Sequence, residues 1–197
     1  QVLVMPTGAG KTITAAGIAL GARDKGKVTL FVVDRIALAD QAAETMERLG
    51  LATSVLRGED SRIVPGHNVV VASIQTLARR RVPDVDLVVI DEVHVLHRAH
   101  VALLERWDAV PVIGLTATPF SRGLGEWFTN LVVPTSIAEL TAGGLLVPVT
   151  PFGPSRPDLA GVRTRAGDFA LGDLAARMNR RELHADILTT WQRLGQD

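Results

Sequence analysis

The segment from Met5 to Thr12 constrains the fold of this chain more than any other. It contains Gly8 and Gly10 followed by Lys11 and Thr12, and it lies between an apolar run and a stretch of helical composition. Glycines in such a loop let backbone N–H groups turn toward a phosphate, and the N-terminus of the next helix adds its positive dipole. The segment therefore predicts a phosphate-binding loop between a strand and a helix.

The polar groups of this loop suit a nucleoside triphosphate, expected to be ATP, with Mg²⁺. The residues expected to contact the nucleotide are Pro6, Thr7, Gly8, Ala9, Gly10, Lys11 and Thr12. Lys11 would reach the β- and γ-phosphates, and the Thr12 hydroxyl would bind Mg²⁺. The general pattern begins with glycine, whereas Met5 stands at that position here, so a plain glycine-rich turn is the alternative.

A pair of acidic residues follows the apolar run Leu87 to Ile90. Ligands of open parallel sheets bind at the carboxyl ends of the strands, where Asp91 and Glu92 would lie. We expect Asp91 to bind Mg²⁺, and Glu92 to orient or deprotonate the water that attacks the γ-phosphate. The alternative is a simple helix cap, a common role of acids after a strand.

Two threonines stand at the end of another apolar run, in the segment Gly114 to Pro119. The hydroxyls of Thr116 and Thr118 could couple strands to the nucleotide, and Pro119 would stop further strand pairing. A turn with helix-capping threonines is the alternative.

Short apolar runs alternate with helical stretches over the first part of the chain. The runs expected to be buried strands are Val2 to Met5, Thr29 to Val33, Val69 to Ala72, Leu87 to Ile90 and Val112 to Leu115. Strands without polar alternation are typical of sheets covered by helices on both faces. The sequence therefore predicts an α/β fold, a three-layer sandwich around a doubly wound, mainly parallel sheet.

The sequence changes character near residue 150. Prolines at positions 148, 151, 154 and 157 interrupt regular structure, and two helical stretches follow, Leu171 to Met178 and Glu182 to Leu194. We predict an ATP-binding domain over residues 1–150, and a proline-rich linker with helices over residues 151–197.

Composition excludes several classes of protein. No apolar run approaches the roughly 18 residues of a membrane span, and the chain has no cysteine, so a cytoplasmic location without a membrane partner is expected. Lysine and arginine together number 21 and equal the acidic residues. Any nucleic acid would therefore have to bind a local surface and not a general positive field.

Five motifs in order give the chain a family resemblance. They are Pro6-Thr7-Gly8-Ala9-Gly10-Lys11-Thr12, Val33-Asp34-Arg35 with Leu38 and Gln41, Ala72-Ser73-Ile74-Gln75-Thr76-Leu77, Asp91-Glu92-Val93-His94 and Thr116-Ala117-Thr118-Pro119. From residue 1 to about residue 150, the chain resembles the first RecA-like lobe, a P-loop NTPase fold, of the DEAD/DEAH-box helicases of superfamily 2. It looks closest to phage and bacterial helicases similar to the type III restriction subunit and the excision-repair helicases.

The resemblance implies roles for residues outside the phosphate loop. It implies that Arg35, Gln75 and Thr76 contact the nucleic-acid backbone, a role that suits their polar side chains. A solvated arginine at a turn is the alternative for Arg35. It further implies that His94 couples the γ-phosphate to an opposing lobe, and that Thr116 and Thr118 link hydrolysis to movement.

The function implied is that of an ATP-dependent helicase lobe, with DNA favoured over RNA and a second RecA-like lobe as partner. An N-terminally truncated lobe is expected, because the family's adenine-binding element lies upstream of the loop. Alone it should hydrolyse ATP slowly, since the second lobe supplies an arginine finger worth about 10³–10⁵ in turnover. The alternatives are a double-strand translocase or restriction-type subunit that does not unwind, and a nucleotide-binding module without motor activity.

Overall fold

A computed structural model describes residues 1–57, 63–79, 84–96, 98–107, 109–149, 158–165, 168–179 and 181–195. The chain divides into two compact units, Gln1–Val147 and Pro148–Asp197. Most of the predicted proline-rich linker, residues 151–157, lies outside the described residues.

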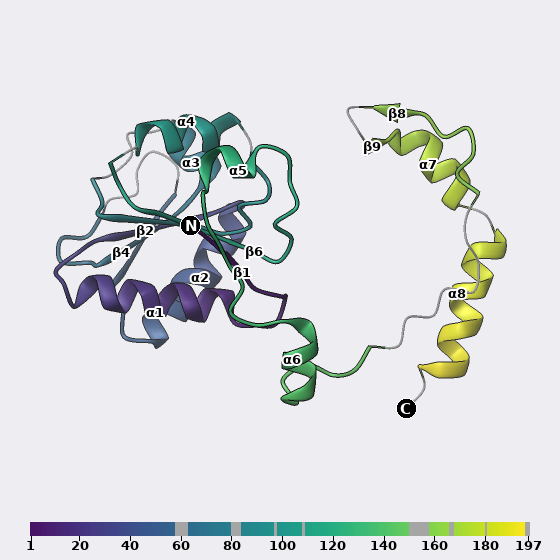
Figure 1. Ribbon diagram of the computed structural model, residues 1–197, viewed down its shortest axis with the longest axis horizontal. Coiled ribbons are helices and arrows are strands. Elements are labelled where there is room, and N and C mark those ends of the chain that lie inside the picture. The colour runs from purple at the N-terminus through teal and green to yellow at the C-terminus, as the bar shows by residue number, and fades with distance from the viewer. Residues whose placement is uncertain are drawn as a thin grey trace. The chain divides into compact units, whose positions relative to one another are not determined.

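A parallel sheet of seven strands forms the centre of the first unit, counted over the described residues (Figure 1). The strands are β1 (Val2–Val4), β2 (Thr29–Val33), β3 (Thr53–Leu56), β4 (Val69–Ser73), β5 (Leu87–Ile90), β6 (Val112–Thr116) and β7 (Leu131–Val132). Their order across the sheet is β3-β4-β2-β5-β6-β1-β7. The strand that precedes the phosphate loop therefore lies between β6 and β7.

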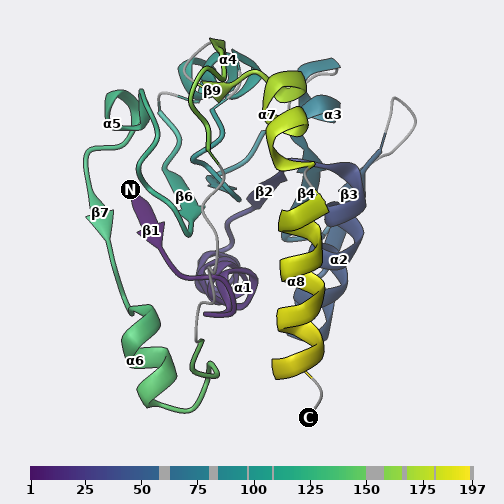
Figure 2. The same cartoon turned by 90° about the vertical axis from the view of Figure 1, so that its right-hand side faces the viewer.

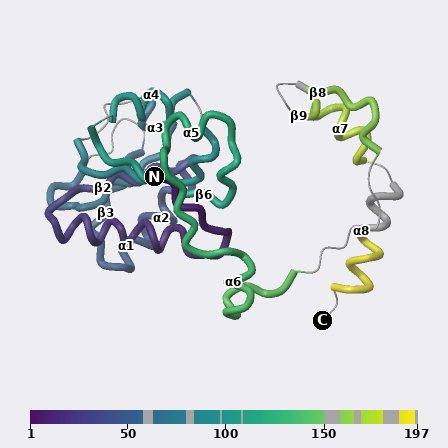
Figure 3. The backbone as a smooth tube through the Cα atoms, viewed as in Figure 1, coloured from purple at the N-terminus to yellow at the C-terminus, as the bar shows by residue number. Residues whose placement is uncertain are grey.

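Helices cover both faces of this sheet. They are α1 (Lys11–Arg23), α2 (Ile36–Arg48), α3 (Ile74–Arg79), α4 (Arg98–Arg106) and α5 (Leu124–Trp127). A further helix, α6 (Ile137–Ala142), follows β7. In Figure 1, α1 and α2 lie on one side of the sheet, and α3, α4 and α5 on the other. Figure 3 follows the same backbone path from β1 to α6.

Alternate residues of the central strands supply two separate cores. Leu30 and Val32 of β2 pack with residues of α3, α4 and α5, whereas Phe31 and Val33 pack with the alanines of α1 and α2. Because both sides of the strand are buried, it carries no polar alternation. The predicted three-layer sandwich with a parallel sheet is confirmed.

Two strands of this sheet were not predicted from the sequence. β3 begins with two polar residues, Thr53 and Ser54, which are nevertheless buried. β7 has only two residues, and both are exposed at the edge of the sheet. Hydrophobic pattern alone misses β3 because its first two residues are polar, and misses β7 because it is too short to be told from an exposed loop.

The turn after β5 packs tightly against β6. A Cβ atom added to Gly114 would lie 2.6 Å from Val93 Cγ1, and the Val93 N–H donates to the Leu115 carbonyl at 3.0 Å. Val93 is fully buried, so it has no room to withdraw. Only glycine at position 114 lets the turn that carries Asp91 and Glu92 approach β6 this closely.

A Gly114→Ala substitution should therefore destabilise the fold by about 1–3 kcal/mol through overpacking. The measurement is urea unfolding. Gly21→Ala is the matched control, because nothing lies within 4 Å of a Cβ at that exposed position of α1. The control should be neutral or slightly stabilising, since alanine favours helix over glycine. A Gly114→Ala midpoint equal to that of the unsubstituted chain would refute the tight packing.

The second unit contains the strands β8 (Thr164–Arg165) and β9 (Asp168–Phe169), which pair antiparallel. The helices α7 (Leu171–Met178) and α8 (Arg181–Leu194) follow, at the two stretches predicted as helices. Arg163 Nε lies 2.7 Å from Asp173 Oδ2 and ties the segment before β8 to α7. Within the described residues, no helix is both long and apolar enough to cross a membrane.

Candidate nucleotide site

Three predicted motifs meet at the carboxyl edge of the sheet. Val4 of β1 pairs with Thr116 of β6, and Ile90 of β5 pairs with Gly114 of β6. The segments that follow these parallel strands therefore emerge side by side. They are the phosphate loop, the turn Asp91 to His94, and the segment after Thr116.

The backbone of the phosphate loop has the curvature that the sequence predicts. Gly8 and Gly10 have φ values of 85° and 81°, in the left-handed region that glycine adopts at little cost. A hydrogen bond of 3.0 Å from the Ala9 N–H to the Pro6 carbonyl closes the turn. Gly10 is the N-cap of α1, and the first turn of that helix has no acidic residue. The positive end of the helix dipole is thus left uncompensated, as an anion site requires.

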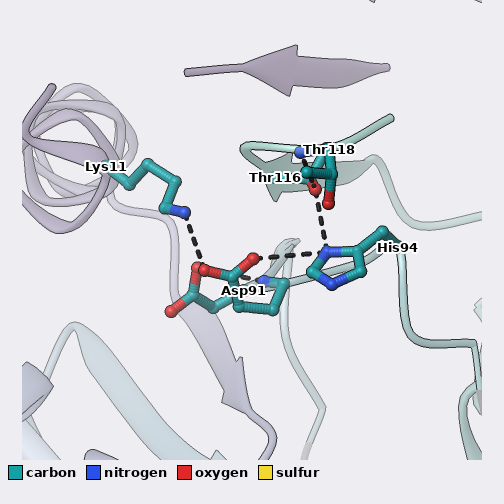
Figure 4. Close-up of polar contacts among 6 residues, drawn as sticks. Lys11, Asp91, His94, Thr116 and Thr118 are labelled. Carbon is teal, nitrogen blue, oxygen red and sulfur yellow. Dashed lines mark hydrogen bonds and ion pairs between the residues drawn. The ribbon is translucent and has the colours of Figure 1, made fainter. Parts of the chain in front are cut away.

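Lys11 joins the loop to the acidic turn. Its Nζ lies 2.7 Å from Glu92 Oε1, and their side chains are 13% and 37% exposed (Figure 4). Thr7 and Gly8 are exposed, whereas Pro6, Ala9 and Thr12 are half-buried. Because the ammonium already contacts Glu92, it would have to exchange that carboxylate for phosphate oxygens when a nucleotide binds.

Glu92 has an unusual backbone conformation. Its φ is 48°, and no other non-glycine residue among those described has a positive φ. The Glu92 N–H donates to Asp91 Oδ1 at 3.0 Å, which helps to hold the turn. A non-glycine residue keeps such a strained backbone conformation only where surrounding contacts hold it in place. Residues of this kind are concentrated at functional sites.

A cation bound beside Asp91 would stabilise the ionised form of its carboxyl group. Burial raises the pKa of the Asp91 carboxyl, and the neighbouring Glu92 charge raises it further. The hydrogen bond from the Glu92 N–H, and then Lys11 and His94, lower the pKa but do not cancel the rise. Carboxylate and hydroxyl oxygens are the donors that Mg²⁺ prefers, so Asp91 and Thr12 fit the ion chemically.

His94 extends the polar contacts to the third motif. Its Nδ1 lies 3.3 Å from Glu92 Oε2 and 2.9 Å from Thr116 Oγ1 (Figure 4). Thr116 Oγ1 also accepts the Thr118 N–H at 3.0 Å. The structure therefore links Lys11, Glu92, His94, Thr116 and Thr118 in one continuous polar chain.

The residues proposed to contact nucleic acid follow two neighbouring strands, because Val33 of β2 pairs with Ser73 of β4. The Arg35 side chain is 81% exposed, with Nε 3.6 Å from Asp34 Oδ2, and Gln75 is exposed in the first turn of α3. Thr76 is only 8% exposed, and its hydroxyl lies 3.0 Å from Ser73 Oγ. Arg35 and Gln75 thus face solvent, whereas the Thr76 hydroxyl is turned inward.

A cavity of about 120 Å³ is lined in part by the metal-binding candidates, Thr12 and Asp91. Its lining consists of Thr12, Phe31, Val33, Leu38, Gln41, Ala42, Thr45 and Asp91. Four of these residues belong to α2, the helix that follows Arg35. The space can hold several water molecules next to polar groups. It connects the region of Asp91 with the helix beside the proposed nucleic-acid surface.

Leu146 lies beside the phosphate loop and was not predicted from the sequence to do so. The side chain of Leu146 occupies the space next to Gly8, with Cδ2 3.0 Å from where a Cβ on Gly8 would stand. An isolated leucine carries no motif, so nothing in the sequence pointed to this contact.

Comparisons with known proteins find a matching family model and similar folds. The family model described as "Type III restriction enzyme, res subunit" matches residues 1–121. The UvsW helicase from bacteriophage T4 is similar in structure, with a TM-score of 0.59 and 19% identity over 68% of this chain and 54% of that one. The helicase domain of Pyrococcus furiosus Hef has a TM-score of 0.54 and 28% identity, covering 68% and 35%.

A third solved structure, the Sulfolobus solfataricus SWI2/SNF2 ATPase core in complex with dsDNA, has a TM-score of 0.50 and 19% identity. The match covers 60% of this chain and 27% of that one. The chain thus corresponds to about half the length of the matched UvsW chain, and to smaller shares of the others.

Proposed function

The chain belongs to the family of the type III restriction enzyme res subunit and is a helicase-type ATP-binding lobe, and from that premise we propose how its site works. We propose that residues 6–12 bind ATP with Mg²⁺, and that the lobe couples hydrolysis to movement along nucleic acid. The observation that carries this proposal is the polar chain from Lys11 through Glu92 and His94 to Thr116 and Thr118.

The roles of the individual groups follow from their positions. Backbone N–H groups of the loop and the start of α1 would hold the phosphates, and Lys11 would contact the β- and γ-phosphate oxygens. Mg²⁺, held by Thr12 and Asp91, would neutralise negative charge on those phosphates. Glu92, no longer paired with Lys11, would orient the attacking water and accept its proton.

The contacts of His94 suggest how the phosphate state reaches the rest of the protein. Glu92 and Thr116 both contact His94 Nδ1, which has either a proton or a lone pair to share between them. A change at Glu92 during hydrolysis would therefore alter the contact to Thr116 and the segment carrying Thr118. This route would couple hydrolysis to movement, with a second RecA-like lobe as the moving partner.

We propose DNA as the nucleic acid, bound across Arg35 and Gln75. One structural relative, the SWI2/SNF2 ATPase core, was solved with double-stranded DNA, and the Hef and UvsW relatives are named helicases. The exposed guanidinium and amide suit contacts to phosphate and sugar without base readout. The absence of cysteine suits a reducing compartment, and we propose the cytoplasm as the location.

The test is phosphate release by this chain at high protein concentration, alone and with single-stranded DNA, duplex DNA or single-stranded RNA. We expect slow turnover that DNA increases. Stimulation mainly by duplex DNA, without strand displacement, would favour a translocase. ATP binding that no nucleic acid affects would overturn the helicase proposal in favour of a nucleotide-binding module.

A further inference from the structure

The segment that follows α6 passes directly over the phosphate loop. Leu146 Cδ2 occupies the space where Gly8 would carry a side chain, 3.0 Å from that Cβ position. A side chain at position 8 would be strained by the positive φ of Gly8, and its Cβ atom would press on Leu146 Cδ2. A leucine side chain cannot bind phosphate, so its contact acts on the loop backbone.

Exposure alternates along this segment. The side chains of Leu145 and Val147 are 74% and 79% exposed, whereas Leu146 between them is half-buried. Leu146 is therefore the member of this apolar run that turns inward onto Gly8. The adjacent Leu145 provides a chemically identical side chain on the same segment that faces solvent.

The hydrogen bonds at the end of α6 fix the position of Leu146. The N–H groups of Leu145 and Leu146 both donate to the Leu140 carbonyl, at 2.9 and 3.2 Å. Leu140 is the buried residue of α6. At the other end, Ser136 and Glu139 form a reciprocal capping box. These contacts make α6 and the Leu146 backbone a defined unit, not a loose tail.

The sheet brings this unit to the loop. Val2 and Leu3 of β1, which leads into the phosphate loop, pair with Leu131 and Val132 of β7, which leads into α6. In the cartoon views, α6 lies near the end of α1 that the loop precedes (Figure 1, Figure 2). One side of the phosphate loop, at Gly8, thus contacts a segment from far along the chain.

We propose that Leu146 is a positioning residue for the phosphate loop, holding Gly8 in the conformation that binds a triphosphate. The inference rests on the proposed function, because Leu146 would be a further residue of the same nucleotide site. Binding groups held in place before the ligand arrives lose less freedom on binding. Removing the Leu146 side chain should therefore weaken affinity for the triphosphate group, whether or not a nucleoside is attached.

The test compares Leu146→Ala, Leu146→Met and the control Leu145→Ala in the full chain by isothermal titration calorimetry. The ligands are ATP with Mg²⁺ and inorganic triphosphate with Mg²⁺. We expect Leu146→Ala to weaken both by the same factor, about three- to tenfold. Leu146→Met should restore most of the affinity, and Leu145→Ala should bind as the unsubstituted chain does. Melting temperatures without ligand establish that each variant is folded at the titration temperature.

The outcomes distinguish failure of the inference from failure of the function. If the unsubstituted chain binds both ligands and Leu146→Ala binds them equally well, the positioning role is wrong while the nucleotide site stands. If Leu146→Ala weakens ATP alone, Leu146 contacts the nucleoside and the loop-positioning role is wrong. If the folded, unsubstituted chain binds neither ligand, the proposed function fails and the inference fails with it.

Discussion

A Glu92→Gln substitution is expected to slow phosphate release by about 10²–10⁴-fold while leaving ATP bound, because the amide cannot accept the proton of the attacking water. The amide keeps the size of the side chain, so the turn from Asp91 to His94 should hold its shape. Binding should not weaken, since the substitution also frees Lys11 from its 2.7 Å contact with Glu92. Loss of catalysis with retained affinity is the signature of a group that acts in the chemical step.

The measurement for Glu92→Gln is single-turnover phosphate release with protein in excess over ATP, together with an independent determination of ATP affinity. Glu47→Gln is the matched control, because Glu47 is exposed on α2. The control should release phosphate at the unsubstituted rate. A rate for Glu92→Gln within about threefold of the control would remove Glu92 from the catalytic role.

A Lys11→Ala substitution is expected to weaken ATP binding by about 10- to 100-fold. Each charge-assisted hydrogen bond from the ammonium to phosphate contributes on the order of 1.5–3 kcal/mol. The substitution also leaves the Glu92 carboxylate without its cation, so two acidic residues would face the incoming phosphates. Both effects weaken ATP binding. We expect them to reduce ATP affinity by a larger factor than they reduce the hydrolysis rate of bound ATP.

Equilibrium titration with ATP and Mg²⁺ measures the Lys11 effect. Lys27→Ala is the matched control, because Lys27 also pairs with a carboxylate, Asp86 at 2.8 Å, but on the exposed surface. Its affinity for ATP should be unchanged. Equal affinities for the Lys11 and Lys27 variants would mean that the nucleotide binds elsewhere.

Much of the fold and the core of the site could be predicted from the sequence. The central strands are continuous apolar runs, and residues that follow such strands gather at one edge of a parallel sheet. That single rule brings together the phosphate loop, Asp91, Glu92 and Thr116. The Lys11–Glu92 contact could be expected from their shared location and opposite charges, although its geometry could not.

The remaining features depend on packing between segments distant in sequence. The order of the strands, with β1 between β6 and β7, is not encoded in any one segment. Thr76 belongs to a motif expected to meet nucleic acid, yet tertiary packing buries it against Ser73. The contact of Leu146 with Gly8 depends on β7 bringing α6 beside the loop, and hydrophobic periodicity carries no information about such pairings.

The central claim is that a triphosphate binds in the loop and displaces Glu92 from Lys11. The most direct test is a crystal structure of the chain with Mg²⁺ and a non-hydrolysable ATP analogue. We predict the β-phosphate within the loop from Gly8 to Thr12, Mg²⁺ near Thr12 and Asp91, and Lys11 Nζ moved from Glu92 to phosphate oxygens. An analogue bound away from this loop, or a Lys11–Glu92 ion pair still intact beside bound phosphates, would contradict it.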